Sequence, residues 1–266
     1  MREYIFFLFL LPLLPSLPAY AQEIEEGVKE IFISRTGPPL PVIDGKWSVV
    51  GEWGMSTERL FVYEDEARIA IRLAHERENI YVLLDMVSDT SVDRGTDKAV
   101  ICFDTELNGG DKFDIDDYCF MAVLDGSFTT YSGGGGIDAL SPIASPPHAE
   151  MKAGVSDVFD RYSRIPHLAY ELKVPIESLK RTDVLGFYAA VFDSSTKTTY
   201  SWPISLSHGD DVEIKGPSEW GKLISPDKSI PEFPTGISFI TGLILLSIIF
   251  ITRGKLKLWG TPLRNA

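Results

Sequence analysis

Residues 98–124 read KAVICFDTELNGGDKFDIDDYCFMAVL and contain the strongest fold signal in the chain. Two runs rich in Val, Ile, Phe, Tyr and Ala flank an insert with six carboxylates, which is typical of a long β-hairpin. In the expected strands both faces are apolar, with Ile101, Phe103, Tyr118 and Phe120 on one and Val100, Cys102, Cys119 and Met121 on the other. We therefore expect this hairpin in the middle of a sandwich rather than at an edge.

The only two cysteines lie one in each run of the hairpin. If the strands pair so that Asp104 faces Asp117, then Cys102 faces Cys119, and a disulfide between them is expected in an exported protein. Two alternatives stay open. The cysteines could be buried free thiols that pack as small apolar groups, or a diagonal register could leave the sulfur atoms too far apart.

Both ends of the chain are expected to lie outside the globular part. An apolar run follows Arg2 and leads to Ala19-Tyr20-Ala21, the pattern of a signal peptide comprising residues 1–21. An uncleaved anchor is disfavoured because prolines break this short run. Residues 235–252 carry no charge and, as a helix, would extend about 27 Å, close to the thickness of a bilayer core. They predict a transmembrane helix after a proline-containing linker at 225–234.

The charges around that helix set its expected orientation. Residues 253–266 carry four basic and no acidic side chains, so this tail is predicted to be cytoplasmic. Residues 22–234 are then outside, with 20 of the 25 basic and 37 of the 38 acidic residues, a net charge of −17. Such a surface argues against binding nucleic acid or anionic lipid by charge.

Short apolar runs, separated by turn residues, fill the exported part. We expect strands at 28–34, 59–63, 67–73, 79–87, 127–131, 150–156, 168–174 and 184–192, a helical turn at 176–179, and closing segments at 200–203 and 218–224. No internal repeat is evident. The predicted fold is all-β, a single antiparallel β-sandwich domain over residues 22–224.

Several short motifs follow one another between residues 43 and 221. They are Ile43-Asp44-Gly45, Glu52-Trp53, Asn79-Ile80-Tyr81-Val82, Cys102-Phe103-Asp104-Thr105, Asp116-Asp117-Tyr118, Tyr170-Glu171-Leu172 with Val174-Pro175, and Trp220-Gly221. Their order resembles the family 9 carbohydrate-binding modules and the wider DOMON-like superfamily, over roughly residues 28–224. The resemblance implies a β-sandwich that in some members holds calcium and clamps a sugar between aromatic side chains.

A sugar site of this kind needs aromatic faces and polar groups for the sugar hydroxyls. Trp53 and Trp220 fall on fold-defining positions of the pattern. Trp47 and Trp202 are then the ligand-binding candidates, with Tyr131 and Tyr200 as helpers. The paired tryptophans of the sugar-binding members have no clear match here, so the alternative is that these four rings belong to the core or its rim.

The acidic insert of the hairpin is the predicted calcium site. Ca²⁺ takes about six to eight oxygen ligands, which carboxylates, amides and backbone carbonyls of a Gly-containing loop can supply. The expected ligands are Asp104, Asn108, Asp114, Asp116 and Asp117, with Glu106 and Asp111 as further candidates. The spacing is not that of an EF-hand. The alternative is a solvated acidic surface.

A second branch of the superfamily binds haem through Met with His or Lys and transfers electrons. The residues that could do so here are Met86, Met121, Met151, His148 and Lys152, and no C-x-x-C-H motif is present, so such a haem would be non-covalent. An enzyme is not predicted, because neither H-E-x-x-H nor G-x-S-x-G occurs.

The sequence after the expected sandwich contains Pro231-Glu232-Phe233, then the hydrophobic stretch, then basic residues. This order resembles the archaeal PEF-type sorting signal, which is processed by an archaeosortase. The long tail leaves a retained single-span helix open. We expect a non-catalytic carbohydrate-binding module with structural calcium on an archaeal cell surface. The alternatives are the haem module and a structural or adhesion domain without a small ligand.

Overall fold

The computed structural model describes residues 29–76, 78–134 and 140–225. The predicted signal peptide at 1–21, residues 226–234 of the linker, the predicted transmembrane helix at 235–252, the PEF motif and the basic tail lie outside these residues. Within the described ranges, no helix has the length and apolar character needed to cross a membrane.

The described residues form strands and two short 3-10 helices. The strands are β1 (Glu30–Phe32), β2 (Ser34–Arg35), β3 (Thr57–Val62), β4 (Arg68–Glu76), β5 (Asn79–Met86), β6 (Lys98–Asp104), β7 (Asp117–Val123), β8 (Phe128–Ser132), β9 (Ser141–Ile143), β10 (Glu150–Val155), β11 (Leu168–Pro175), β12 (Val184–Asp193), β13 (Thr198–Trp202), β14 (Ser205–His208) and β15 (Gly221–Ile224). The helices are η1 (Ile176–Leu179) and η2 (Pro217–Glu219).

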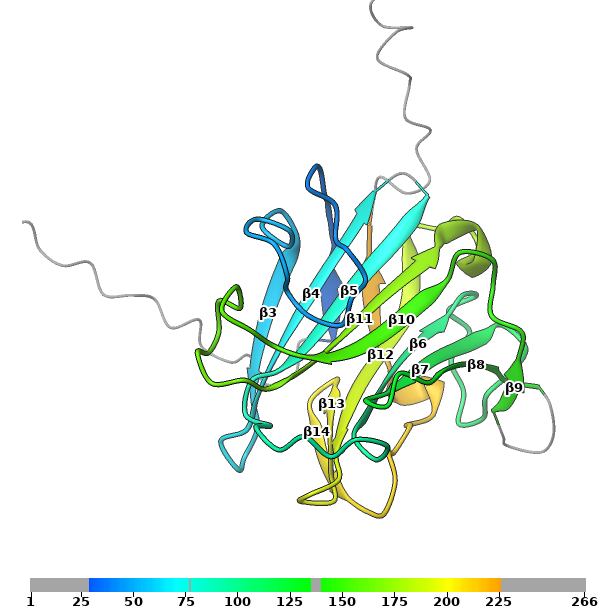
Figure 1. Ribbon diagram of the computed structural model, residues 1–266. Helices are drawn as coiled ribbons and strands as arrows, with labels where there is room; N and C mark the ends of the chain where they lie inside the picture. Colours follow the sequence, from blue (N-terminus) through cyan, green and yellow to red (C-terminus); the bar gives the residue numbers. More distant parts are fainter. Residues whose placement is uncertain (1–28, 77, 135–139, 226–266) are drawn as a thin grey trace, which may run out of the picture.

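Two sheets pack face to face (Figure 1). One has nine strands in the order β1-β15-β12-β6-β7-β8-β9, with β13 paired to β12 and β14 to β13. The other has six strands in the order β10-β11-β5-β4-β2, with β3 paired to β4. The all-β sandwich is therefore confirmed.

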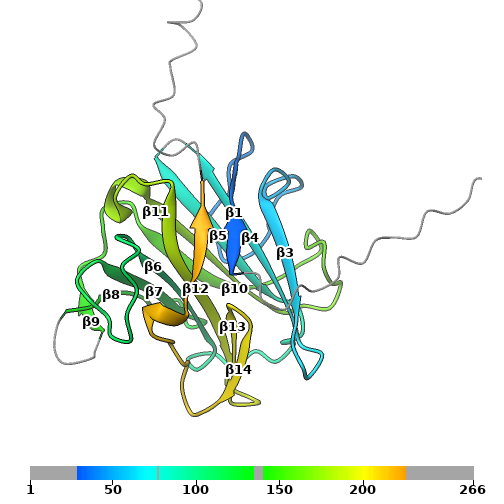
Figure 2. The same cartoon turned by 180° about the vertical axis from the view of Figure 1, so that it is seen from behind.

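The strictly antiparallel arrangement that the sequence predicts is wrong at the N-terminus. The expected strand at 28–34 is divided between the two sheets: β1 lies parallel to β15, and β2 lies parallel to β4. Figure 2 shows β1 beside β15, so the first and last strands of the described chain adjoin. β1 lies at an edge of the nine-stranded sheet and β2 at an edge of the six-stranded sheet. One residue separates the two strands, so the chain passes directly from one sheet to the other.

The hairpin of β6 and β7 has the register that the sequence predicts. Asp104 pairs with Asp117, and Cys102 pairs with Cys119. The two cysteines are joined as a disulfide, with their Cα atoms 4.0 Å apart. Both strands have neighbours on either side, β12 next to β6 and β8 next to β7, so the hairpin is central as expected.

Apolar side chains cover both faces of this hairpin. Its inner face, with Phe103 and Phe120, belongs to the main core between the sheets. Its outer face contains the disulfide and packs under Tyr188 and Trp220, with partly buried side chains from the segments around residues 113 and 212–214. Burial on both sides explains why the hairpin lacks the alternation of a half-exposed strand.

A loop that we call the cap, residues 37–56, covers the outer face of the six-stranded sheet. Its Trp47 and Trp53 pack against Tyr81, Leu83 and Ala169. Gly45 has φ +93°, and a Cβ there would collide with the backbone at Ala153 and Gly154, so only glycine fits where the cap meets β10.

Buried Glu171 of β11 anchors this cap. One carboxylate oxygen accepts hydrogen bonds from the backbone N–H groups of Asp44 (3.0 Å) and Gly45 (2.9 Å), and the other accepts one from Trp53 Nε1 (2.9 Å). Residues from three of the resemblance motifs, Ile43-Asp44-Gly45, Glu52-Trp53 and Tyr170-Glu171-Leu172, therefore meet at one point in the fold.

Arg72 shows a consequence of the cap that strand periodicity does not reveal. It shares a face of β4 with exposed Arg68, yet it is only 1% exposed because the cap covers it. Its guanidinium donates hydrogen bonds to Tyr162 Oη (2.7 Å) and the Trp53 carbonyl (2.8 Å) and forms an ion pair with Glu58. It also lies 4.9 Å from the centre of the Trp47 ring.

Candidate ligand and cation sites

Three of the four aromatic candidates for sugar binding are buried. Trp202 is 1% exposed and Tyr200 4% exposed in the main core, and Trp47 is 5% exposed under the cap. A sugar ring needs an open aromatic face, so the prediction that these three rings form a ligand platform is corrected. Among the described residues every tryptophan is buried.

Tyr131 is the candidate that remains accessible. It lies on β8 opposite Cys119 and is partly exposed on the outer face of the nine-stranded sheet. Thr129, on the same face of β8, and Met121, which pairs with Thr129 from β7, are also partly exposed. An aromatic ring, a hydroxyl and an apolar side chain therefore adjoin on this surface.

The acidic insert brings together three of the five predicted calcium ligands. We call Asp104, Asp116 and Asp117 the hairpin cluster; all are buried, and each offers a carboxylate oxygen within 4.8 Å of the others. Asp104 accepts hydrogen bonds from the backbone N–H groups of Leu107 (2.6 Å) and Gly109 (3.0 Å). Asp117 Oδ1 is buried and has no hydrogen-bond partner.

The remaining acidic-loop residues lie around this cluster or turn away from it. Asn108 donates a hydrogen bond to Asp114 (2.9 Å) beside the cluster. Glu106 forms an ion pair with Lys180, and Asp111 accepts a hydrogen bond from Ser218. The structure thus places Asn108 and Asp114 beside the cluster, whereas the side chains of Glu106 and Asp111 bond elsewhere. The spacing of these residues in the sequence does not show this distinction.

Burial leaves negative charge in the hairpin cluster without full compensation. It raises the pKa of Asp117 to about 7 and, with the hydrogen bond to Asp114, raises the pKa of Asp116 to about 6. Hydrogen bonding to Asp116 lowers the pKa of Asp114. A divalent cation would favour the ionised form of all these carboxylates.

Sequence reasoning missed a second acid-only group, which we call the strand-end cluster: Asp89, Asp97 and Asp193. They follow β5, precede β6 and end β12, and the pairing of β6 with β12 brings the last two together. Each of the three carboxylates accepts a hydrogen bond of 2.7 Å from a serine hydroxyl. A serine two positions after Asp89 and after Asp193 is a weak sequence signal, and Asp97 has none, because its serine partner, Ser194, comes from the end of β12.

One buried polar group in the strand-end cluster and one beside it lack hydrogen bonds. They are Asp89 Oδ2 and the hydroxyl of Tyr170. Burial raises the pKa of Asp89 to about 6, and burial together with the three nearby carboxylates raises the pKa of Tyr170. A cation among these oxygens would supply the missing partner.

The candidate haem ligands do not converge on one another. Met86 and Met151 are buried in the main core, whereas His148 and Lys152 are exposed. Met151 and Lys152 are adjacent on β10 and point to opposite faces. Met121 belongs to the outer face of the other sheet.

No known protein family matches this sequence, and no curated protein matches it. Among solved structures, the chain is similar to a family 9 carbohydrate-binding module from Caldicellulosiruptor kristjanssonii in complex with cellotriose, with 16% identity and a TM-score of 0.49 over 77% of this chain and 100% of that one. A second structure of a family 9 module from the same organism, in complex with glucose, has 13% identity and a TM-score of 0.48 over the same shares. Both likenesses concern the course of the chain, and neither identifies a binding residue here.

Proposed function

We propose that the sandwich is a non-catalytic module that binds a carbohydrate, contains calcium and is displayed on the outer face of a cell membrane. The observation that carries the ligand class is Tyr131, partly exposed beside Thr129 and Met121. The ring and the methionine suit the apolar face of a sugar, and the threonine hydroxyl can bond a sugar hydroxyl. Pairing with Cys119 ties Tyr131 to the disulfide-linked central strands, which limits its movement on binding.

Replacing Tyr131 with alanine is expected to weaken glycan binding about tenfold, equivalent to about 1.4 kcal/mol, because the stacking surface is lost. A glycan array run on the full chain, with and without calcium, identifies the ligand, and titration of that glycan measures the loss. Tyr131→Phe should bind almost as well as the wild type.

Phe32→Ala is the matched control for this substitution. Phe32 is 55% exposed at the far edge of the same sheet, separated from β8 by β15, β12, β6 and β7, so its loss should leave affinity unchanged. If no glycan binds in either condition, the carbohydrate proposal is abandoned.

Calcium is proposed for the two acid-only clusters. Their ligand atoms are carboxylate oxygens, the type Ca²⁺ prefers, and each cluster contains a buried carboxylate oxygen without a hydrogen-bond partner. The hairpin cluster lies at strand ends of the nine-stranded sheet, and the strand-end cluster lies where β5 of the six-stranded sheet comes close to β6 and β12; a bound ion would fasten the loops at both places.

Removing calcium is expected to lower the melting temperature of the full chain. An ion present at about 100 times its dissociation constant adds about 2.7 kcal/mol, which is about 5–10 °C for a domain of this size. Calorimetry in EDTA and after calcium is restored measures the shift. Asp117→Asn should reduce it, while Asp125→Asn, at the exposed turn between β7 and β8, should not. Equal melting temperatures with and without calcium would contradict the calcium proposal, and the loops would then be acidic without binding an ion.

Surface display is proposed from the two ends of the sequence. The signal-peptide pattern, the uncharged stretch at 235–252 and the basic residues beyond it support it. Intact mass of the protein from its native membrane tests both ends: loss of residues 1–21 is expected, and the C-terminal mass distinguishes a retained helix from archaeosortase processing. A full-length mass contradicts export by this route.

A further inference from the structure

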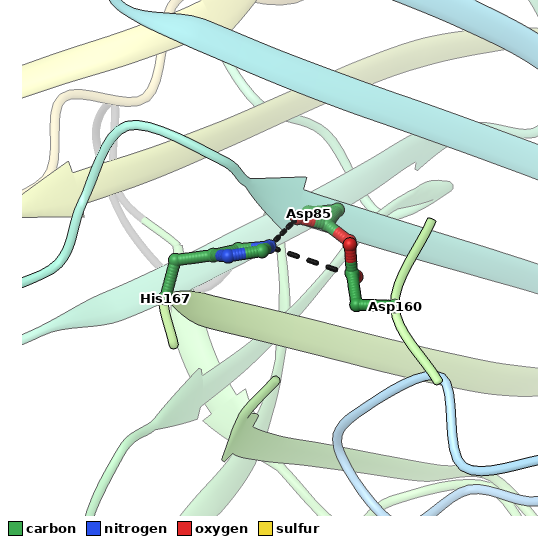
Figure 3. Close-up of side chains that lie close together, drawn as sticks. All are labelled: Asp85, Asp160 and His167. Carbon is green, nitrogen blue, oxygen red and sulfur yellow. Dashed lines mark hydrogen bonds and ion pairs between the residues drawn. The ribbon is translucent and has the colours of Figure 1, made fainter. Parts of the chain in front are cut away.

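A third cluster contains an imidazole as well as carboxylates and joins three separate segments of chain. Asp85 lies in β5, Asp160 in the loop between β10 and β11, and His167 immediately before β11 (Figure 3). Their side chains are at most 1% exposed. We call them the His167 cluster; nothing in the sequence patterns or in the proposed carbohydrate site uses them.

The ring of His167 is held with one nitrogen turned toward the two carboxylates. Nε2 lies 2.6 Å from Asp85 Oδ1 and 3.6 Å from Asp160 Oδ2. On the other side of the ring, Nδ1 lies 2.8 Å from the carbonyl oxygen of Ile165. Because a carbonyl only accepts, Nδ1 carries a proton; Nε2 donates a second proton to Asp85 Oδ1, and a metal ion would displace that proton and take up the Nε2 lone pair. This is the arrangement in which histidine binds metals.

Both carboxylates contain a buried oxygen without a hydrogen-bond partner. The atoms are Asp85 Oδ2 and Asp160 Oδ2, and Figure 3 shows the two carboxylates turned toward each other. The other oxygen of Asp160 is occupied, because it accepts hydrogen bonds from the N–H groups of Tyr162 (2.6 Å) and Ser163 (3.1 Å). Two facing acceptors in a dry interior repel each other unless a shared proton or a metal cation lies between them.

We propose that Asp85, Asp160 and His167 bind one zinc-class divalent metal ion. Two carboxylates, a neutral imidazole and a dication sum to zero charge, which suits a site closed to water. The imidazole nitrogen separates this site from the two acid-only clusters, since nitrogen with carboxylate ligands favours Zn²⁺ whereas Ca²⁺ favours oxygen alone.

The distances fit a tetrahedral ion after a small adjustment. Zinc bonds to nitrogen and oxygen are about 2.0–2.2 Å, so neighbouring ligand atoms lie about 3.4 Å apart. The 3.6 Å from Nε2 to Asp160 already matches. The 2.6 Å from Nε2 to Asp85 must lengthen when the metal replaces the hydrogen between them. A second carboxylate oxygen or a water completes the set.

The ion would have a structural role. The cluster fastens the loop between β10 and β11 to β5, and buried Ser156, at the start of that loop, also bonds the His167 ring (3.0 Å). No member has a surface open to a substrate. The inference does not depend on the proposed carbohydrate or calcium sites.

The test uses the full chain, purified without a histidine tag. The chain is unfolded in the presence of a chelator to remove bound metal, and is then refolded with Zn²⁺ or Co²⁺ in excess calcium. One equivalent of zinc is expected by elemental analysis after desalting. Cobalt is expected to give the visible absorption of a low-coordinate site, and zinc to abolish it. Calcium is present throughout, so failure of the calcium proposal does not affect the result.

His167→Gln and Asp85→Asn should lose the bound zinc. His208→Gln, which removes an exposed histidine at the end of β14, is the matched control and should retain one equivalent. If the two cluster variants do not fold, the cobalt spectrum of the wild-type chain decides alone. A wild-type chain without bound zinc or cobalt absorption overturns the proposal, and so does zinc retained by folded His167→Gln.

Discussion

Glu171→Ala is expected to destabilise the chain by about 3–5 kcal/mol, because it leaves three N–H donors without an acceptor, two of them in buried hydrogen bonds. The donors are the backbone groups of Asp44 and Gly45 and the indole of Trp53, each within 3.0 Å of a Glu171 oxygen. Burial raises the pKa of Glu171 to about 8, and its oxygens accept these bonds in either protonation state. Urea unfolding of the full chain in calcium measures the loss.

A conservative and a matched substitution separate the lost contacts from general sensitivity. Glu171→Gln keeps one acceptor but turns an amide N–H₂ toward donors, so it should cost less than alanine, about 2 kcal/mol. Glu177→Ala removes a glutamate whose side chain is 74% exposed and should change stability by less than about 0.5 kcal/mol. Limited proteolysis within the cap, residues 37–56, should accelerate only in the Glu171 variants. A Glu171→Ala chain as stable as the Glu177 control contradicts the anchoring role.

The contacts of Glu171 give a physical meaning to the motifs that produced the family resemblance. Asp44-Gly45, Glu52-Trp53 and Glu171 lie far apart in the sequence but together build the attachment of the cap. Glu52 accepts the N–H groups of Val42 (2.6 Å) and Ser48 (2.9 Å) within it. These residues therefore report how one face of the sheet is covered. They do not form a ligand-binding site, so the resemblance predicts the fold better than the function.

The sequence predicts the local part of this fold well. The hairpin register follows from residues only 17 positions apart, and apolar runs locate most strands. The short strands β9 and β14 were missed because they are only three and four residues long. Pro142 also makes β9 hard to predict, because proline is rare inside strands.

The sites depend on long-range packing and could be predicted only in part. Asp104, Asp116 and Asp117 belong to one hairpin, so their proximity follows from the turn. Asp97 and Asp193 meet only through the pairing of β6 with β12, and Asp85 and His167 through the pairing of β5 with β11. Likewise, alternation along β4 assigns Arg72 to the same face as Arg68, but only the position of the cap, which contains Trp47, shows that this face is closed.

Trp202→Ala is expected to cost about 3–5 kcal/mol of stability, because it opens a large cavity between the sheets. The ring packs 5.5 Å from the centre of Phe187 and lies over Gly221, where a Cβ would collide with it. Trp202→Phe should cost less, and Tyr131→Ala, at a partly exposed ring, should cost about 1 kcal/mol. Unfolding and glycan titration on the same samples distinguish the two roles: replacing a core residue mainly lowers stability, whereas replacing a ligand-binding residue mainly lowers affinity and changes stability by about 1 kcal/mol or less. The latter outcome for Trp202 would contradict its place in the core and return it to the sugar site, leaving Gly221 without its packing explanation.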